Sequence, residues 1–112
     1  MKKKPKILFV RSIYNDTKPL YVSAHNKLKS QKITHREITV PGAFEIPVTI
    51  ARNIKKFDGF VAIGVIIKGE TPNFDLISHA ITNGLIDLSI ISKKPIGNAI
   101  LTCLNSDQAK AR

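Results

Sequence analysis

Short apolar runs alternate with amphipathic stretches along this chain of 112 residues, and that alternation limits the fold more than any other feature. Runs of β-branched residues bounded by charged or turn-forming residues are typical of buried strands. Apolar residues that recur every three to four positions indicate helices packed on one side. We therefore expect strands over residues 7–10, 33–40, 60–67 and 96–104, and helices over residues 19–29, 43–56, 71–91 and from Ser106 onward. Because strand and helix alternate, the sequence predicts an α/β fold with a parallel sheet.

Proline and threonine mark the starts of two predicted helices. Pro47 falls in the first turn of the helix over residues 43–56, where its missing N–H costs little. Thr71 is expected to cap the long helix, and Pro72 to be its first residue. We expect the apolar side of that helix to contain four residues, Leu76, Ala80, Leu85 and Leu88.

Composition excludes several classes of protein. The single cysteine, Cys103, excludes a disulfide framework and a zinc site of four thiolates, and it suits a reducing compartment. No apolar run approaches the ~18 residues that a membrane-spanning helix needs. We therefore expect a cytoplasmic protein without membrane contacts.

Positive charge is concentrated in the first half of the chain. Residues 1–56 contain 13 basic and 3 acidic residues, a net charge of +10, whereas residues 57–112 contain 5 of each. A basic half is compatible with nucleic acid, with an anionic small substrate, or with a solvated lysine-rich surface. Only 6% of the residues are aromatic, and the lysines do not alternate with them, so a single-strand nucleic-acid groove has little support.

The loops that follow the predicted strands are where a ligand is expected to bind, because ligands of open parallel sheets bind beyond the carboxyl ends of the strands. One of these loops has the glycine spacing of a P-loop from Gly64 to Thr71. Glu70 replaces the phosphate-binding lysine, and apolar residues fill the loop, which excludes nucleotide hydrolysis. The turn at residues 69–71 still precedes a helix, so it either binds an anion or is an ordinary helix start.

The three histidines are weak candidates for catalysis or metal binding. We expect His25 and His35 on polar surface. His79 follows Ser78 directly, and adjacent residues on a helix do not face each other. No pair of histidines or carboxylates has the spacing of metal ligands.

Taken together, the loop motifs resemble those of the lumazine synthase family. The matching segments are Val40–Pro47 (VPGAFEIP), Gly64–Asp75 (GVIIKGETPNFD), Ile96–Arg112 (IGNAILTCLNSDQAKAR) and the aromatic-Asn pair Tyr14-Asn15 after the first strand. The resemblance covers essentially the whole chain in order. It implies a flavodoxin-like three-layer α/β/α domain over residues 1–112, with a parallel four-stranded sheet of order 2-1-3-4. It also implies a homopentamer or a larger assembly of pentamers, active sites shared by adjacent subunits, and no metal or organic cofactor.

The reaction implied by the resemblance joins two small molecules. Lumazine synthases condense 5-amino-6-ribitylaminouracil with 3,4-dihydroxy-2-butanone 4-phosphate, and 6,7-dimethyl-8-ribityllumazine, phosphate and water are formed. Tyr14 would stack on the pyrimidine. The residues that would hold the pyrimidine and the ribityl chain by side chain or backbone are Ala43, Phe44, Glu45, Val65, Ile66 and Ile67.

The phosphate and the far edge of the ring would be bound by other parts of the assembly. Glu70 and Thr71 would line the phosphate site with their amides, in agreement with the helix-start argument. From a neighbouring subunit, Asn98 would reach the ring edge and Arg112 would bind the phosphate.

Two departures from the family pattern bear on activity. The family places a histidine thought to move protons where this chain has Asn73, and an amide cannot take up a proton near neutral pH. Family members also continue past the position of Arg112 with a lysine near the phosphate and a last helix, which this sequence lacks. We expect a slow enzyme. The alternatives are a non-catalytic member that binds a ribityl or flavin-like ligand or only assembles, and a basic nucleic-acid binder.

Overall fold

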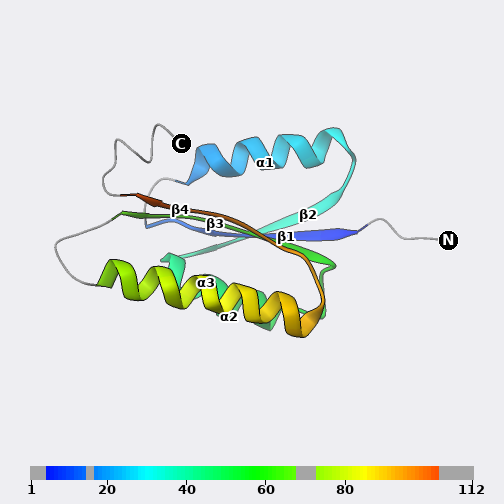
Figure 1. Cartoon of the computed structure of the whole chain (residues 1–112). Coiled ribbons are helices and arrows are strands. Elements are labelled where there is room, and N and C mark those ends of the chain that lie inside the picture. The colour runs from blue at the N-terminus through cyan, green and yellow to red at the C-terminus, as the bar shows by residue number, and fades with distance from the viewer. Residues whose placement is uncertain (1–4, 15–16, 68–72, 104–112) are drawn as a thin grey trace.

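The computed structural model of the protein describes residues 5–14, 17–67 and 73–103, and its elements form three layers. They are β1 (Lys6–Ser12), α1 (Lys18–Ser30), β2 (Thr34–Val40), the short 3-10 helix η1 (Ala43–Glu45), α2 (Ile46–Arg52), β3 (Gly59–Ile67), α3 (Asn73–Ser92) and β4 (Ile96–Cys103). Helix α1 covers one face of the sheet, and α2 and α3 cover the other (Figure 1). The layers confirm the expected α/β/α architecture.

The four strands form one parallel sheet in the order β2-β1-β3-β4, as the resemblance implies. Strand β1 pairs with β2 from Lys6↔Thr34 to Ser12↔Val40, and with β3 from Ile7↔Gly59 to Arg11↔Ile63. Because all the strands run the same way, their carboxyl ends meet along one edge of the sheet, which we call the carboxyl rim.

The main core lies between the sheet and the layer formed by α2 and α3. In β1, Leu8 and Val10 face this core, while Phe9 between them packs on the other face against Tyr21 of α1. From α2, Ile46 and Ile50 are fully buried in the same core. The side chains of α1 are at most half-buried, because this helix rests on the outer half of the sheet over β1 and β2.

The prediction of one α-helix over residues 43–56 is wrong in two respects. The observed segment begins as a 3-10 helix, and its α-helical part is shorter than expected. A 3-10 turn comes first, with the Glu45 amide donating to the Gly42 carbonyl (3.1 Å), and the α-helix then runs only from Ile46 to Arg52. Pro47 has no N–H to donate to an α-helical carbonyl, so the chain before it tightens into the shorter turn. At the other end the Asn53 side chain donates to the Thr49 carbonyl (2.8 Å), and the chain leaves the helix there.

The apolar side of α3 is only partly as predicted. Leu85 is buried and Leu88 packs against the core, but Leu76 and Ala80 are exposed. The stripe that faces the core consists of Ile77, Ile81, Leu85 and Leu88. Leu76 and Ala80 precede Ile77 and Ile81 by one residue, which turns their side chains about 100° away from the core. The helix is apolar on more than one side, so spacing alone did not select the buried stripe.

Helix α3 also approaches α2 closely. A Cβ at Gly84 would lie 3.3 Å from the Cβ of Pro47, so the small residue permits this contact. The helix expected from Ser106 lies outside the described residues. Within the ranges that the structure describes, no helix is long and apolar enough to cross a membrane.

Candidate active site

The carboxyl rim brings three loop regions together. The amide of Ile13, directly after β1, donates to the carbonyl of Val40 at the end of β2 (3.0 Å). The 3-10 helix that follows β2 contacts β1, β3 and α3. A Cβ built on Gly64 would lie 3.0 Å from Ser12 Oγ and 3.4 Å from the Cβ of Ala43. The end of β1, the middle of β3 at Gly64 and the start of η1 are therefore close together, and glycine at position 64 leaves room for this approach.

Two aromatic side chains are exposed at this rim. Tyr14, two residues after β1, is 85% exposed, and Phe44 in η1 is 61% exposed. Aromatic faces usually pack against other apolar groups, so exposed rings beside the strand ends are available to a flat ligand. Glu45 is half-buried, and its carboxylate folds back over the Gly42 turn, where a Cβ would lie 3.3 Å from Oε2.

The end of β3 projects along the rim. The pairing of β1 with β3 ends at Arg11↔Ile63, whereas β3 continues to Ile67 beside β4. Val65 is buried, and Ile66 and Ile67 are half-buried. This last stretch of β3 therefore extends beyond its register with β1, which suits the predicted role of residues 65–67 in offering backbone groups to a ligand.

The predicted phosphate site lies mostly outside the described residues. Glu70, Thr71 and Arg112 all fall there, and so does the side chain of Asn73. Helix α3 begins at Asn73, six residues after β3 ends at the carboxyl rim, so the start of the helix lies on that side of the sheet (Figure 1).

The structure does not bring Asn98 to the rim of its own chain. Asn98 is the third residue of β4 and pairs with Ala62, well before the end of either strand. Its exposed side chain accepts a hydrogen bond from the amide of Ile100 through Oδ1 (2.9 Å). Within one chain, Asn98 is therefore separate from Tyr14 and Phe44.

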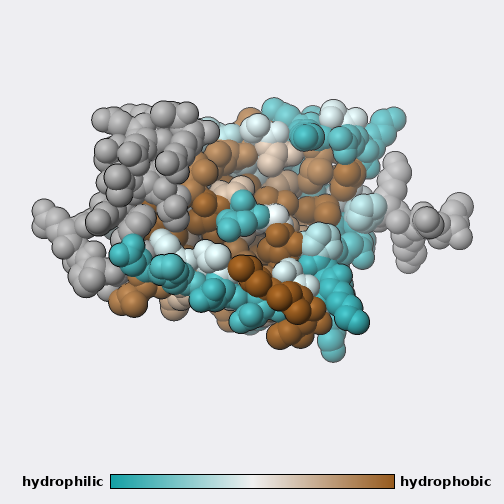
Figure 2. Space-filling model, in the orientation of Figure 1, coloured by the Kyte–Doolittle hydropathy of each residue, from teal (hydrophilic) through white to brown (hydrophobic). Residues whose placement is uncertain are grey.

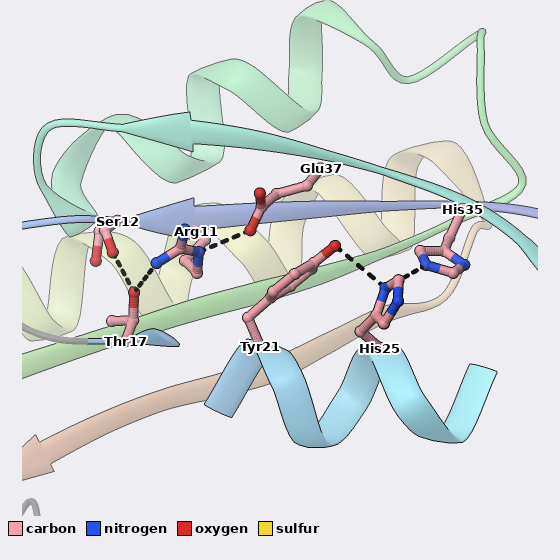
Figure 3. Close-up of polar contacts among 7 residues, drawn as sticks. All are labelled: Arg11, Ser12, Thr17, Tyr21, His25, His35 and Glu37. Carbon is pink, nitrogen blue, oxygen red and sulfur yellow. Dashed lines mark hydrogen bonds and ion pairs between the residues drawn. The ribbon is translucent and has the colours of Figure 1, made fainter. Parts of the chain in front are cut away.

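A buried polar contact that the sequence did not indicate fixes the loop after β1. Thr17 is fully buried, and its hydroxyl donates to the carbonyl of Ser12 (2.5 Å). The same oxygen accepts a hydrogen bond from Arg11 Nη1 (3.2 Å), and Arg11 Nε donates to Glu37 Oε2 of β2 (2.7 Å) (Figure 3). Thr17 makes no side-chain cap for α1, although it stands at the capping position, so its hydroxyl instead holds the start of α1 against the end of β1.

His25 and His35 are not on polar surface as expected. Both are half-buried, and their Nδ1 and Nε2 atoms, respectively, lie 2.7 Å apart between α1 and β2 (Figure 3). Tyr21 adds its hydroxyl 3.3 Å from His25 Nδ1. Burial, with a smaller contribution from the Glu37 carboxylate, raises the pKa of Tyr21, so its phenol stays neutral at physiological pH. Nothing in the sequence indicated that His25 and His35, which are ten residues apart, would be in contact. The contact depends on how α1 crosses the sheet.

Comparison with known proteins identifies the family of this chain. The model of the 6,7-dimethyl-8-ribityllumazine synthase family matches residues 4–112. The chain is 41% identical over 118 residues to the 6,7-dimethyl-8-ribityllumazine synthase of Agrobacterium fabrum, an alignment that covers 97% of this chain and 80% of the relative. It is 38% identical over 117 residues to that of Bartonella tribocorum, covering 100% and 78% of the two chains. The similarity to the Cutibacterium acnes enzyme is 49% identity over 75 residues. The chain therefore belongs to the 6,7-dimethyl-8-ribityllumazine synthase family.

Proposed function

We propose that this protein condenses 5-amino-6-ribitylaminouracil with 3,4-dihydroxy-2-butanone 4-phosphate to form 6,7-dimethyl-8-ribityllumazine, with release of phosphate and water. The observation that carries the proposal is the family match over residues 4–112, which includes every loop at the carboxyl rim. The exposed rings of Tyr14 and Phe44 at that rim support it further.

The proposed binding of the pyrimidine substrate uses the rim of a single chain. Tyr14 stacks on the heterocycle, and Ala43, Phe44 and Glu45 hold the ring and the ribityl chain. The Glu45 carboxylate lies over the Gly42 turn at the rim, where it would accept hydrogen bonds from the ribityl hydroxyls. The projecting end of β3 offers the backbone of Val65, Ile66 and Ile67 to the edge of the ring.

The proposed phosphate site needs two chains. The amides of Glu70 and Thr71, ahead of α3, bind the phosphate at the start of that helix. Asn98 and Arg112 come from a neighbouring subunit, which agrees with the separation of Asn98 from the rim of its own chain. An arginine and oriented amides stabilise the negative charge of the departing phosphate.

Positioning can supply much of the rate acceleration in such a site. Two substrates that are held in one geometry react as if at very high concentration, an advantage of up to ~7–11 kcal/mol in favourable cases. Asn73 lies where the resemblance places a proton-transferring histidine, and the loss of such a group typically costs ~10²- to 10⁴-fold in rate. We therefore propose an active but slow enzyme.

The direct test mixes purified protein with both substrates and follows lumazine absorbance and fluorescence over hours. Slow formation of lumazine above the uncatalysed rate is expected. Binding of the ribityl substrate without any product would support the alternative, a non-catalytic member that binds a ribityl ligand. If neither binding nor product is detected, the proposed function is wrong.

The proposed working form is a homopentamer or an assembly of pentamers in the cytoplasm, with residues 1–112 as one domain in each subunit. The need for Asn98 and Arg112 from a second copy argues for association. The sequence contains a single cysteine, which suits a reducing compartment.

A further inference from the structure

Three ring side chains meet between α1 and the outer half of the sheet, on the opposite face from α2 and α3 (Figure 3). Tyr21 and His25 lie one turn apart on α1, and His35 is on β2. His35 Nε2 is 2.7 Å from His25 Nδ1, and the Tyr21 hydroxyl is 3.3 Å from that same nitrogen. The group is separate from the carboxyl rim and plays no part in the proposed reaction.

The hydrogen bonds determine which nitrogens carry protons. His35 Nδ1 lies 3.1 Å from the carbonyl of Ile33, and a carbonyl can only accept, so this nitrogen is the donor. In the neutral ring, His35 Nε2 then carries a lone pair. The short contact is therefore made by a proton on His25 Nδ1 that points at His35 Nε2. Two imidazole nitrogens thus converge on a single proton.

Packing holds the two rings in place. Phe9 of β1 contacts His35 edge-on with ring centroids 5.6 Å apart, and it contacts Tyr21 in the same way at 5.4 Å. The two imidazoles are themselves 4.6 Å apart between centroids and nearly perpendicular. The backbone carbonyl that accepts from His35 Nδ1 is a typical outer partner of a histidine that binds metal through Nε2. Such a partner fixes the ring orientation before any metal arrives.

We propose that His25 Nδ1 and His35 Nε2 form a binding site for a divalent transition metal of the Zn²⁺ class, which replaces the proton between them. Imidazole nitrogens are preferred ligands of Zn²⁺, Ni²⁺ and Cu²⁺. Two nitrogens bound to one Zn²⁺ ion at ~2.0–2.1 Å in tetrahedral geometry lie about 3.3 Å apart, so the rings need to separate by only about 0.6 Å. Water would complete the coordination, and the Tyr21 hydroxyl, 3.3 Å from His25 Nδ1, borders the site.

One nearby cation is already engaged: the side chain of Arg11 lies over the Tyr21 ring at 5.5 Å from the centroid. Arg11 is paired with Glu37 at 2.7 Å, so its charge is balanced locally. The spacing of ten residues between the two histidines hid the site from the sequence, since the ligands come from a helix and the following strand.

The test titrates the full chain, freed of metal with a chelator, with Zn²⁺ in a calorimeter. One ion per chain is expected, and His25→Gln and His35→Gln should each weaken binding at least tenfold. His79→Gln on α3 and Cys103→Ser are the matched controls and should bind as the parent does.

A measurement on the unaltered protein guards against variants that misfold. Nitrogen-15 spectra of the imidazoles should show Zn²⁺-dependent shifts at His25 Nδ1 and His35 Nε2 and no shift at either nitrogen of His79. The proposal is overturned if no saturable binding occurs, if both glutamine variants bind as the parent does, or if the shifts appear at His79 instead. In those cases the two histidines act only as a hydrogen-bonded link between α1 and β2.

Discussion

At the scale of single residues, Thr17 shows how a small polar side chain positions the predicted site. Its buried hydroxyl joins the Ser12 carbonyl at the end of β1 to the guanidinium of Arg11. Tyr14, the exposed ring of the rim, lies between Ser12 and Thr17 in the sequence. The hydroxyl therefore fixes both ends of the segment that carries Tyr14.

Replacing Thr17 with valine keeps the shape of the side chain and removes this hydroxyl. The Ser12 carbonyl then loses a buried donor, and we expect the free energy of unfolding to fall by about 1–3 kcal/mol in urea denaturation. Thr17→Ser, which keeps the hydroxyl, should lose clearly less. Equal stability of the valine variant and the parent would show that water replaces the hydroxyl at no cost.

Lys32 follows α1 in a left-handed conformation, with φ of 57°. Its amide donates to the Lys29 carbonyl and the next amide, of Ile33, donates to the Leu28 carbonyl, which is a Schellman ending. Lys32→Gly should raise the free energy of unfolding by about 0.5–1 kcal/mol, because glycine adopts this conformation without strain.

Lys29→Gly is the matched control, since it places the same residue inside the helix only three positions earlier. There glycine should lower stability by about 1 kcal/mol. Thermal or urea unfolding measures both variants, and the same sign for both would contradict the account of the helix end.

Asn73 at the start of α3 is the residue on which the proposed slow rate depends. Asn73→His supplies a group that can gain and lose a proton, so we expect kcat to rise by about 10²-fold or more. Steady-state kinetics with both substrates measure the change, and Asn73→Gln, which cannot titrate, is the control. An unchanged kcat in the histidine variant would mean that proton transfer at this position does not limit the rate.

At the scale of elements, Lys94 joins two loops at the end of the sheet opposite the carboxyl rim. It follows α3, and its ammonium donates to the carbonyls of Ile54 and Phe57 in the segment between α2 and β3. These carbonyls lie beyond the early end of α2. A single side chain thus satisfies two backbone carbonyls in the segment that follows the helix.

Lys94→Met keeps the aliphatic length and removes the donor. We expect the free energy of unfolding to fall by about 1–3 kcal/mol, because two partly buried carbonyls lose a charged partner. Lys55→Met, at an exposed position in the same region, should change it by no more than about 0.5 kcal/mol. Similar losses of stability in both variants would indicate a general effect of removing a positive charge, and not the loss of the two hydrogen bonds that Lys94 makes.

The elements also show where the spacing of apolar residues was enough to predict the structure. All four strands were predicted close to their observed bounds. In β1 and β3 the apolar runs are mostly buried, as in strands covered on both faces. Strand β2 is largely exposed, and it was marked by apolar residues among polar ones and by the Pro41-Gly42 turn. The face of α3 was partly wrong, since Leu76 and Ile77 are equally apolar and only packing against α2 and the sheet separates the exposed residue from the half-buried one.

At the scale of the whole molecule, several large apolar side chains of the described residues are left exposed. Apolar side chains lie on the visible face between α1 and α3 (Figure 2). Near the end of α3, Ile90 and Ile91 are 67% and 81% exposed, and Val48 of α2 is 57% exposed. Apolar surface of this kind is typical of chains that associate, which supports the proposed assembly.

Native mass spectrometry at neutral pH should therefore find particles of five chains or a multiple of five. The number five is an expectation from the family resemblance. The physical reason for association is that contact between copies would remove the exposed apolar side chains from water. A monomer at concentrations where the enzyme turns over would contradict both the assembly and the shared site.

The sequence by itself determined the α/β class, the number of strands and the loops at the carboxyl rim, and its motifs pointed to the family. Those features are encoded locally, by the period of apolar residues and by the residues that start and stop each element. Only the tertiary structure decided that His25 meets His35, that Thr17 closes on Ser12, and that Lys94 reaches carbonyls up to 40 residues away. Such contacts depend on how helices cross the sheet and on strand register, and no local pattern along the chain records either.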